Sequence, residues 1–208
     1  MDNRKRRKLI IDAITEAVSD LGFKHHLGEY FSRCRGGLAD CFFFQQSRSQ
    51  FRFEVIYGID APSILTRLSQ SRVLNPENDK PRLTLAPRIS RLGPYGCKHE
   101  EHVQNSGRKV KSDLESHAIP WLEQVETVED LVEAYRVKEI ADDKPTGVPA
   151  AGRMIKWSIY GMMLVDSGKK TPAIPWLDGA ENAWASSQPS DERSEWLSLI
   201  EATKQSLR

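Results

Sequence analysis

The chain has 208 residues, and its 30 lysines and arginines are balanced by 29 aspartates and glutamates, which leaves a formal net charge of +1. This balance excludes a globally basic nucleic-acid coat and an acidic solvating chain. Hydrophobic residues make up 39% of the chain and include five tryptophans, a composition that excludes a wholly disordered protein. A chain of this length forms one large or two small domains without needing a disulfide or a metal.

The N-terminus is basic, but it does not resemble a secretory signal. The cations of Arg4–Lys8 are followed by only three apolar residues before Asp12, whereas such a signal needs an apolar run of about 7–15 residues. Nowhere do apolar residues continue long enough to span a bilayer. The three cysteines, Cys34, Cys41 and Cys97, cannot all pair with one another, which favours a reducing compartment. We therefore expect a cytoplasmic protein with no membrane contact.

The first sixty residues predict a helix followed by an antiparallel meander. Apolar residues recur on one helical face up to Leu21, and Gly22 is placed to end a helix over about residues 4–21. Aromatic and alternating runs then predict three strands, at Glu29–Arg35, Asp40–Arg48 and Gln50–Ile59.

The middle of the chain is harder to assign. Arg82–Ile89 is a candidate for a fourth strand. Arg91–Arg108 contains three glycines, a proline and no periodicity, so it predicts a long loop or lid. A helix is expected at Val110–Ile119, and Pro120 should end or kink it.

The remainder predicts helices. Thr127 and Asp130 match the ends of a capping box, and Ser190 is a good N-cap for a last helix that carries Trp196 inward. Between them the sequence predicts a polar break at Asp142–Thr146, a helix at Ala150–Val165 and an interruption from Pro172 to Pro175.

Strands followed by helices indicate an α+β fold. We expect an antiparallel sheet of three or four strands, packed by the N-terminal helix and the central helices. Residues 1–140 would form this core domain, and residues 141–208 a helical C-terminal extension packed on it.

The order of motifs in the first half resembles a family of uncharacterised bacterial proteins known only as a domain of unknown function. The matching motifs are Leu21-Gly22-Phe23, an aromatic strand ending in Arg33, a strand closing on Gln45-Gln46-Ser47, an exit at Tyr57-Gly58-Ile59 and, later, Ile119-Pro120-Trp121-Leu122. The resemblance covers about residues 9–135. It implies an accessory or toxin-immunity role, because some family members lie in such loci. No catalytic residue set is established for the family, so the resemblance assigns none to this chain.

One short segment has the composition of a metal site. Cys97, His99 and His102 lie within six residues, and thiolate and imidazole are ligands that zinc prefers. The spacing matches no standard zinc signature. A metal-dependent hydrolase or nuclease built on these residues is therefore an alternative function, with zinc as its cofactor; otherwise we expect no cofactor.

A second alternative is a nucleic-acid-binding protein. It would use the five basic residues of the N-terminus (Arg4, Lys5, Arg6, Arg7, Lys8). The aromatic run Phe42–Phe44 is typical of a stacking platform, but adjacent strand residues divide between the two faces, so most of these rings are expected in the core. The small net charge argues against this function, since nucleic-acid binders usually carry an excess of cations.

Other residues that could take part in catalysis lack a partner side chain that the sequence identifies. His25 or His26 could act as a general base with a carboxylate partner, and Asp40 and Glu54 are the candidates for that partner. Cys34 and Cys41 are best interpreted as small buried hydrophobic residues, because strand alternation turns the neighbouring Arg33 and Arg35 away from Cys34.

No convincing catalytic set emerges, so the sequence favours a non-enzymatic protein-binding module with an unidentified protein partner. The expected contact surface is the exposed face of the sheet together with the Arg91–Arg108 loop. The expected contact residues are Arg52 and Glu54 on the sheet face, with Trp121 and Trp176, each of which follows a proline.

Overall fold

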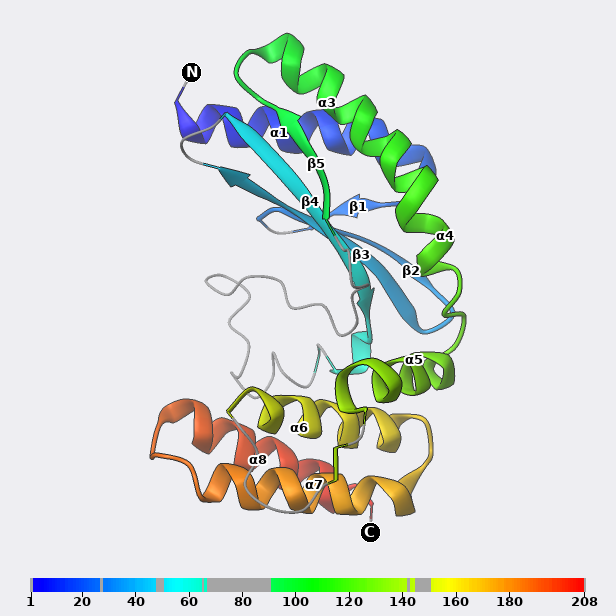
Figure 1. The fold of residues 1–208 in the computed structure, drawn as a ribbon, viewed down its shortest axis with the longest axis vertical. Coiled ribbons are helices and arrows are strands. Elements are labelled where there is room, and N and C mark those ends of the chain that lie inside the picture. The colour runs from blue at the N-terminus through cyan, green and yellow to red at the C-terminus, as the bar shows by residue number, and fades with distance from the viewer. Residues whose placement is uncertain are drawn as a thin grey trace. The chain divides into compact units, whose positions relative to one another are not determined.

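The computed structural model describes residues 2–26, 28–47, 51–64, 66, 91–141, 143–144 and 151–207. The chain divides into two compact units (Figure 1). The first contains the described parts of residues 1–60 and 80–126, and the second those of 61–79 and 127–208. The expected boundary after residue 140 differs from this division, which groups the helix after Thr127 with the C-terminal helices.

The first unit is an α+β unit, as predicted. Helix α1 (Asn3–Val18) is extended by a 3-10 turn to Leu21, and Gly22 ends it with a φ of 80°. The sheet is antiparallel throughout, in the order β1-β2-β3-β4-β5, with five strands where three or four were expected. The strands are β1 (Lys24–His25), β2 (Tyr30–Arg35), β3 (Leu38–Ser47), β4 (Arg52–Asp60) and β5 (Arg91–Gly96).

The prediction of a loop over Arg91–Arg108 is wrong. Residues 91–96 form β5, and α3 (Glu100–Asp113) follows and runs beside α1 (Figure 1). Strand β5 forms because Tyr95 pairs with Phe53, a tertiary contact that overrides local propensity. Helix α3 buries small residues, Ser106 and Gly107, between its valines, so it lacks the apolar stripe that identifies most surface helices. The candidate strand at Arg82–Ile89 lies outside the described residues.

The prolines interrupt the helices less than expected. Of the two outcomes expected at Pro120, an end or a kink, the helix does not end there: a π-helical turn (Leu114–Ala118), which is a local irregularity, leads into α4 (Ile119–Leu122), with Pro120 in its first turn. Pro172 and Pro175 lie inside α7 instead of interrupting the chain. Pro172 is in the first turn, where its missing N–H has no partner to lose. Burial of Leu177 and Trp184 holds the rest of α7 in place.

The second unit is helical. Thr127 and Asp130 form the predicted capping box, and the Ser190 side chain accepts the Arg193 N–H as the predicted N-cap. Among the described residues of the chain, no helix has the length and apolar character needed to cross a membrane. The helices are α5 (Val128–Tyr135) with a π-helical turn to Ile140, α6 (Ala151–Asp166), α7 (Lys170–Ala185) and α8 (Asp191–Gln205).

Candidate functional site

The sheet of the first unit presents two chemically different faces. Alternation places Phe42 and its cross-strand partner Tyr57 on the inner face, where Phe42 packs on Phe23 and Tyr57 on Trp121. The opposite, outer face carries the pairs Ser32–Cys41, Phe43–Ile56, Gln45–Glu54 and Ser47–Arg52.

A buried polar cluster lies on the outer face at β2, β3 and β4. The Tyr30 hydroxyl is 2.6 Å from both Cys41 Sγ and Asp60 Oδ2, and Cys41 and Asp60 are fully buried. A phenol has one proton, and a carboxylate is the stronger acceptor, so Tyr30 donates to Asp60. Burial, followed by the charge of Asp60, raises the pKa of both Tyr30 and Cys41 above their usual values. Both groups therefore stay protonated at neutral pH, and Cys41 is a poor nucleophile.

Neither histidine of the His25-His26 pair meets the acid predicted for it. His26 Nε2 is hydrogen-bonded to Ser32 Oγ at 2.7 Å, and His25 Nε2 lies 3.0 Å from the carbonyl oxygen of Gly28. Asp40 is on the inner face, where Arg33 and Arg35 bind its fully buried carboxylate. Sheet alternation therefore separates this acid from the outer-face residues.

The three cysteines have different environments. Arg33 and Arg35 point away from Cys34 toward Asp40, as alternation predicted. Cys41 and Cys97 are fully buried, but Cys34 is exposed, so its interpretation as a buried hydrophobic residue is wrong. Cys34 is at the end of β2 beyond the two-residue strand β1, which leaves it uncovered.

We expect one fast thiol in a titration of the native protein with a disulfide reagent. Cys34 is exposed, whereas burial raises the pKa of Cys41 and of Cys97, so both are shielded and protonated. The other two thiols should react only after denaturant is added. A Cys34→Ser variant with an unchanged fast phase would contradict this assignment.

The outer strip is the exposed part of the outer face, defined as Phe43, Gln45, Arg52, Glu54, Ile56 and Arg91. Phe43 and Ile56 are cross-strand partners and both are half-buried. Arg91, which pairs with Ile56 across β4 and β5, forms an ion pair with Glu54 at 2.9 Å. The strip is therefore an apolar centre bordered by polar and charged side chains.

The predicted metal ligands are not gathered into a site. Cys97 is fully buried, and its N–H donates to the carbonyl oxygen of Phe51. His99 and His102 are exposed at the start of α3, with ring centroids 5.2 Å apart. Within the described ranges, no three histidine, cysteine, aspartate or glutamate side chains form a group that could hold a metal ion.

The basic N-terminal segment is split by the first turns of α1. Arg6 is buried, with its guanidinium 4.7 Å from the Phe51 ring centre, and Arg7 pairs with Glu29. Arg4, Lys5 and Lys8 are exposed. The three phenylalanines divide between the two faces as expected: Phe42 and Phe44 are core residues, and only Phe43 reaches the outer face, so the run does not form a stacking platform.

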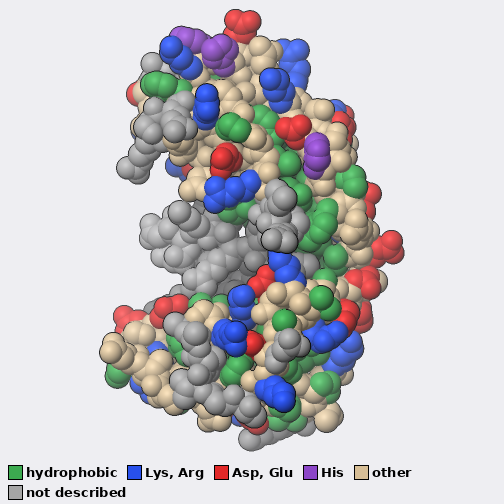
Figure 2. Space-filling view, in the orientation of Figure 1, with side chains coloured by type: hydrophobic (Ala, Val, Ile, Leu, Met, Phe, Trp, Pro, Cys, Tyr) green, Lys and Arg blue, Asp and Glu red, His purple; other side chains and the backbone are tan. Residues whose placement is uncertain are grey.

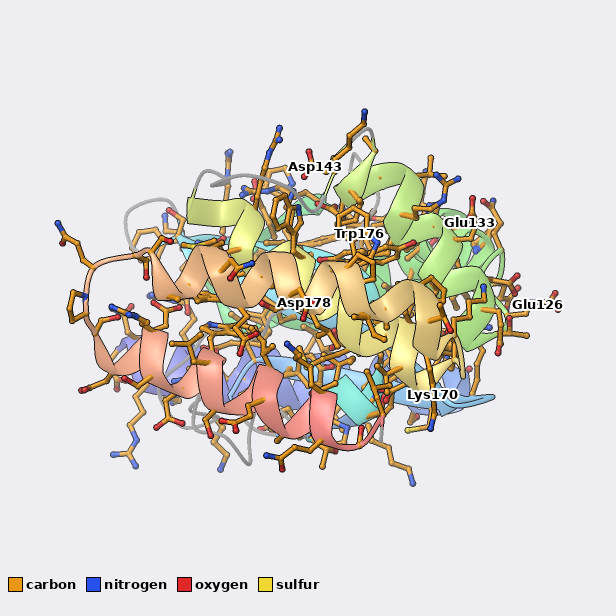
Figure 3. All side chains as sticks on the ribbon, turned by 90° about the horizontal axis from the view of Figure 1, so that it is seen from below. Glu126, Glu133, Asp143, Lys170, Trp176 and Asp178 are labelled. Carbon is orange, nitrogen blue, oxygen red and sulfur yellow. The ribbon has the colours of Figure 1, made fainter. Side chains whose placement is uncertain are left out.

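The predicted contact tryptophans are half-buried and belong to different units. Trp121 packs edge-on against Tyr57, and Trp176, labelled in Figure 3, packs edge-on against Trp157 and Tyr160. Arg52 is exposed and Glu54 is half-buried on the outer strip. Of the four predicted contact residues, the structure brings together only Arg52 and Glu54, on the same face of β4.

The sequence analysis missed Tyr30, Ser32 and Asp60. Asp60 is the last residue of a strand whose preceding residues are apolar. A carboxylate at such a position indicates a buried charge, and a buried charge needs a hydrogen-bond partner. The contact with Tyr30 spans 30 residues and could not be inferred without the strand register. Searches against protein-family models, curated proteins and solved structures found no significant match to this chain.

Proposed function

We propose that this protein is a non-enzymatic protein-binding module and that the outer strip contacts its partner. The observation that carries the proposal is the arrangement of the half-exposed Phe43–Ile56 pair between Gln45, Glu54 and the two arginines. Protein interfaces commonly combine an apolar centre with a polar rim. The resemblance to a family with toxin-immunity members makes neutralisation of a protein partner the corresponding role.

The chemistry of the same face supports binding over catalysis. Tyr30 and Cys41 are two described groups of the outer face that could act as nucleophiles, and burial raises the pKa of each. An enzyme that used either group would need a lowered pKa. The outer strip needs no ionisation change to bind a partner.

The partner is expected to bind the face of the sheet and not its β5 edge. Pro94 lies in β5 and has no N–H to offer an added strand, and the register of β4 with β5 shifts between Phe53 and Val55. Prolines and bulges at sheet edges oppose pairing with another chain.

The test is capture from a lysate of the source organism with matched variants. Ile56→Asp combined with Arg52→Glu places a carboxylate in the apolar centre and reverses the charge of its rim. We expect binding of the captured partner to weaken by roughly 30-fold or more, since a disrupted interface centre costs about 2 kcal/mol or more.

The control carries the same two substitutions at exposed positions elsewhere, Ile174→Asp and Arg108→Glu. Circular dichroism should show that both variants are folded. The proposal would be contradicted if the outer-strip variant retained the partner as well as the wild type does, or if the control variant lost as much binding as the outer-strip variant.

A further inference from the structure

A second surface of the first unit combines an exposed aromatic ring with cations from three elements. Phe51 directly precedes β4, and its side chain is 41% exposed, an unusual value for a large apolar residue. Its carbonyl oxygen accepts the Cys97 N–H, and the buried Arg6 guanidinium lies over its ring. These contacts place β4 beside the first turns of α1 and the start of α3.

The backbone of Phe51 is strained. Its φ is 48°, in the left-handed region that a bulky aromatic residue rarely adopts. Such conformations persist only where the surroundings impose them, and they gather at functional sites. Here the strained residue carries a partly exposed ring that packs on the Arg6 guanidinium.

Exposed cations lie on the elements that meet at Phe51. They are Arg4 and Lys5 on α1, Arg52 on β4 and Lys98 before α3. The cations of α1 lie in its first turns, where positive charge opposes the helix dipole. Figure 2 shows lysine, arginine and histidine side chains gathered at the end of the first unit where α1 and α3 begin. Each of these cations is within two residues along the chain of Phe51 or of a residue that contacts it, Arg6 or Cys97.

We propose that this surface, the Phe51 platform (Phe51, Arg4, Lys5, Arg52 and Lys98), binds single-stranded nucleic acid. The guanidinium of Arg6 occupies one face of the Phe51 ring, and the other face would stack on a base. The four cations would contact the flanking phosphates. The platform shares Arg52 with the outer strip, but its other residues lie outside that strip, and the variants that test it leave the outer strip unchanged.

The chemistry favours a nucleic acid over a lipid surface. An element that inserts into a bilayer presents several apolar side chains along one face, and here Phe51 is the one exposed large apolar residue described near these cations. The carboxylates of Glu100 and Glu101 lie on the first turn of α3 and offset part of the positive charge. We therefore expect micromolar affinity at low salt.

The experiment measures binding of the full chain to a fluorescently labelled oligothymidylate of about fifteen nucleotides, by fluorescence anisotropy. Phe51→Leu should weaken binding by at least about fivefold, since stacking of one base on an aromatic ring contributes that much or more, and Phe51→Trp should retain it. With about four phosphates contacted, raising the salt from roughly 50 to 200 mM should weaken binding roughly 50-fold.

Charge variants separate the platform from general electrostatics. Arg4→Glu with Lys98→Glu should abolish measurable binding, whereas Arg108→Glu with Lys109→Glu, which makes the same charge change further along α3, should leave it within about twofold. The absence of binding by the wild-type protein at low salt would overturn the proposal. So would equal losses in the two charge variants, retained binding by Phe51→Leu, or preferential binding to phosphatidylserine vesicles.

Discussion

Replacement of Asp40 by asparagine should lower the free energy of unfolding of the first unit by about 2–4 kcal/mol, because it removes the buried carboxylate that pairs with two partly buried guanidinium groups. Of the described carboxylates, Arg33 then keeps only the exposed one of Glu123, which lies 3.6 Å away. Asp40 is fully buried, and its carboxylate accepts hydrogen bonds from Arg33 Nε at 2.9 Å and from Arg35 Nε and Nη2 at 3.0 Å. The side chains of Arg33 and Arg35 are 19% and 24% exposed, so solvent screens only part of the loss.

The expected loss is large because the same arginines connect separate elements. Arg33 also donates to the Leu21 carbonyl oxygen at the end of α1, and Arg35 donates to that of Leu122 at the end of α4. Urea unfolding followed by circular dichroism measures the change. The surface pair of Asp20 and Lys111 is the control, and Asp20→Asn should change the midpoint little because both side chains are partly solvated. Equal midpoints for Asp40→Asn and the wild type would show that the buried network contributes nothing.

Gly107→Ala should destabilise the protein by about 1–3 kcal/mol, although alanine is the better helix former by about 1 kcal/mol. A Cβ at Gly107 in α3 would lie 2.7 Å from the carbonyl oxygen of Ala13 and 3.0 Å from its carbon. These are backbone atoms of α1, so relief requires the two helices to move apart and to open the contact between them.

A matched substitution should have the opposite sign. Gly152 is on α6 and a Cβ there would meet nothing within 4 Å, so Gly152→Ala should leave stability unchanged or raise it by up to about 1 kcal/mol. Thermal unfolding of the two variants beside the wild type provides the comparison. If Gly107→Ala unfolded at the same temperature as Gly152→Ala, close packing of α1 on α3 would not be required.

The elements that the sequence predicted correctly depend on local signals. The capping pair Thr127 and Asp130, the N-cap Ser190 and the terminating Gly22 each act within four residues of their helix end. The alternation of Phe53, Val55 and Tyr57 likewise identifies β4 from its own residues.

The failures have a common physical cause, which is long-range contact. Strand β5 exists because β4 pairs with it, and α3 is held against α1 at Gly107, a residue that locally disfavours a helix. The candidate site shows the same limit. Arg52 and Glu54 could be assigned to one face of a strand from the sequence. That Phe43 and Arg91 lie beside them could not be predicted, because it depends on the register between strands.

The most direct test of the proposed binding function is site-specific photo-crosslinking. A photoreactive amino acid is placed at Gln45 on the outer strip or, as the control, at Gln104 on α3, both of which are exposed glutamines. After irradiation in a lysate of the source organism, position 45 should give a discrete crosslinked protein that is lost in the Ile56→Asp/Arg52→Glu background, and position 104 should give none. The same crosslinked protein from both positions, or none from position 45, would contradict the proposal that the outer strip binds a protein partner.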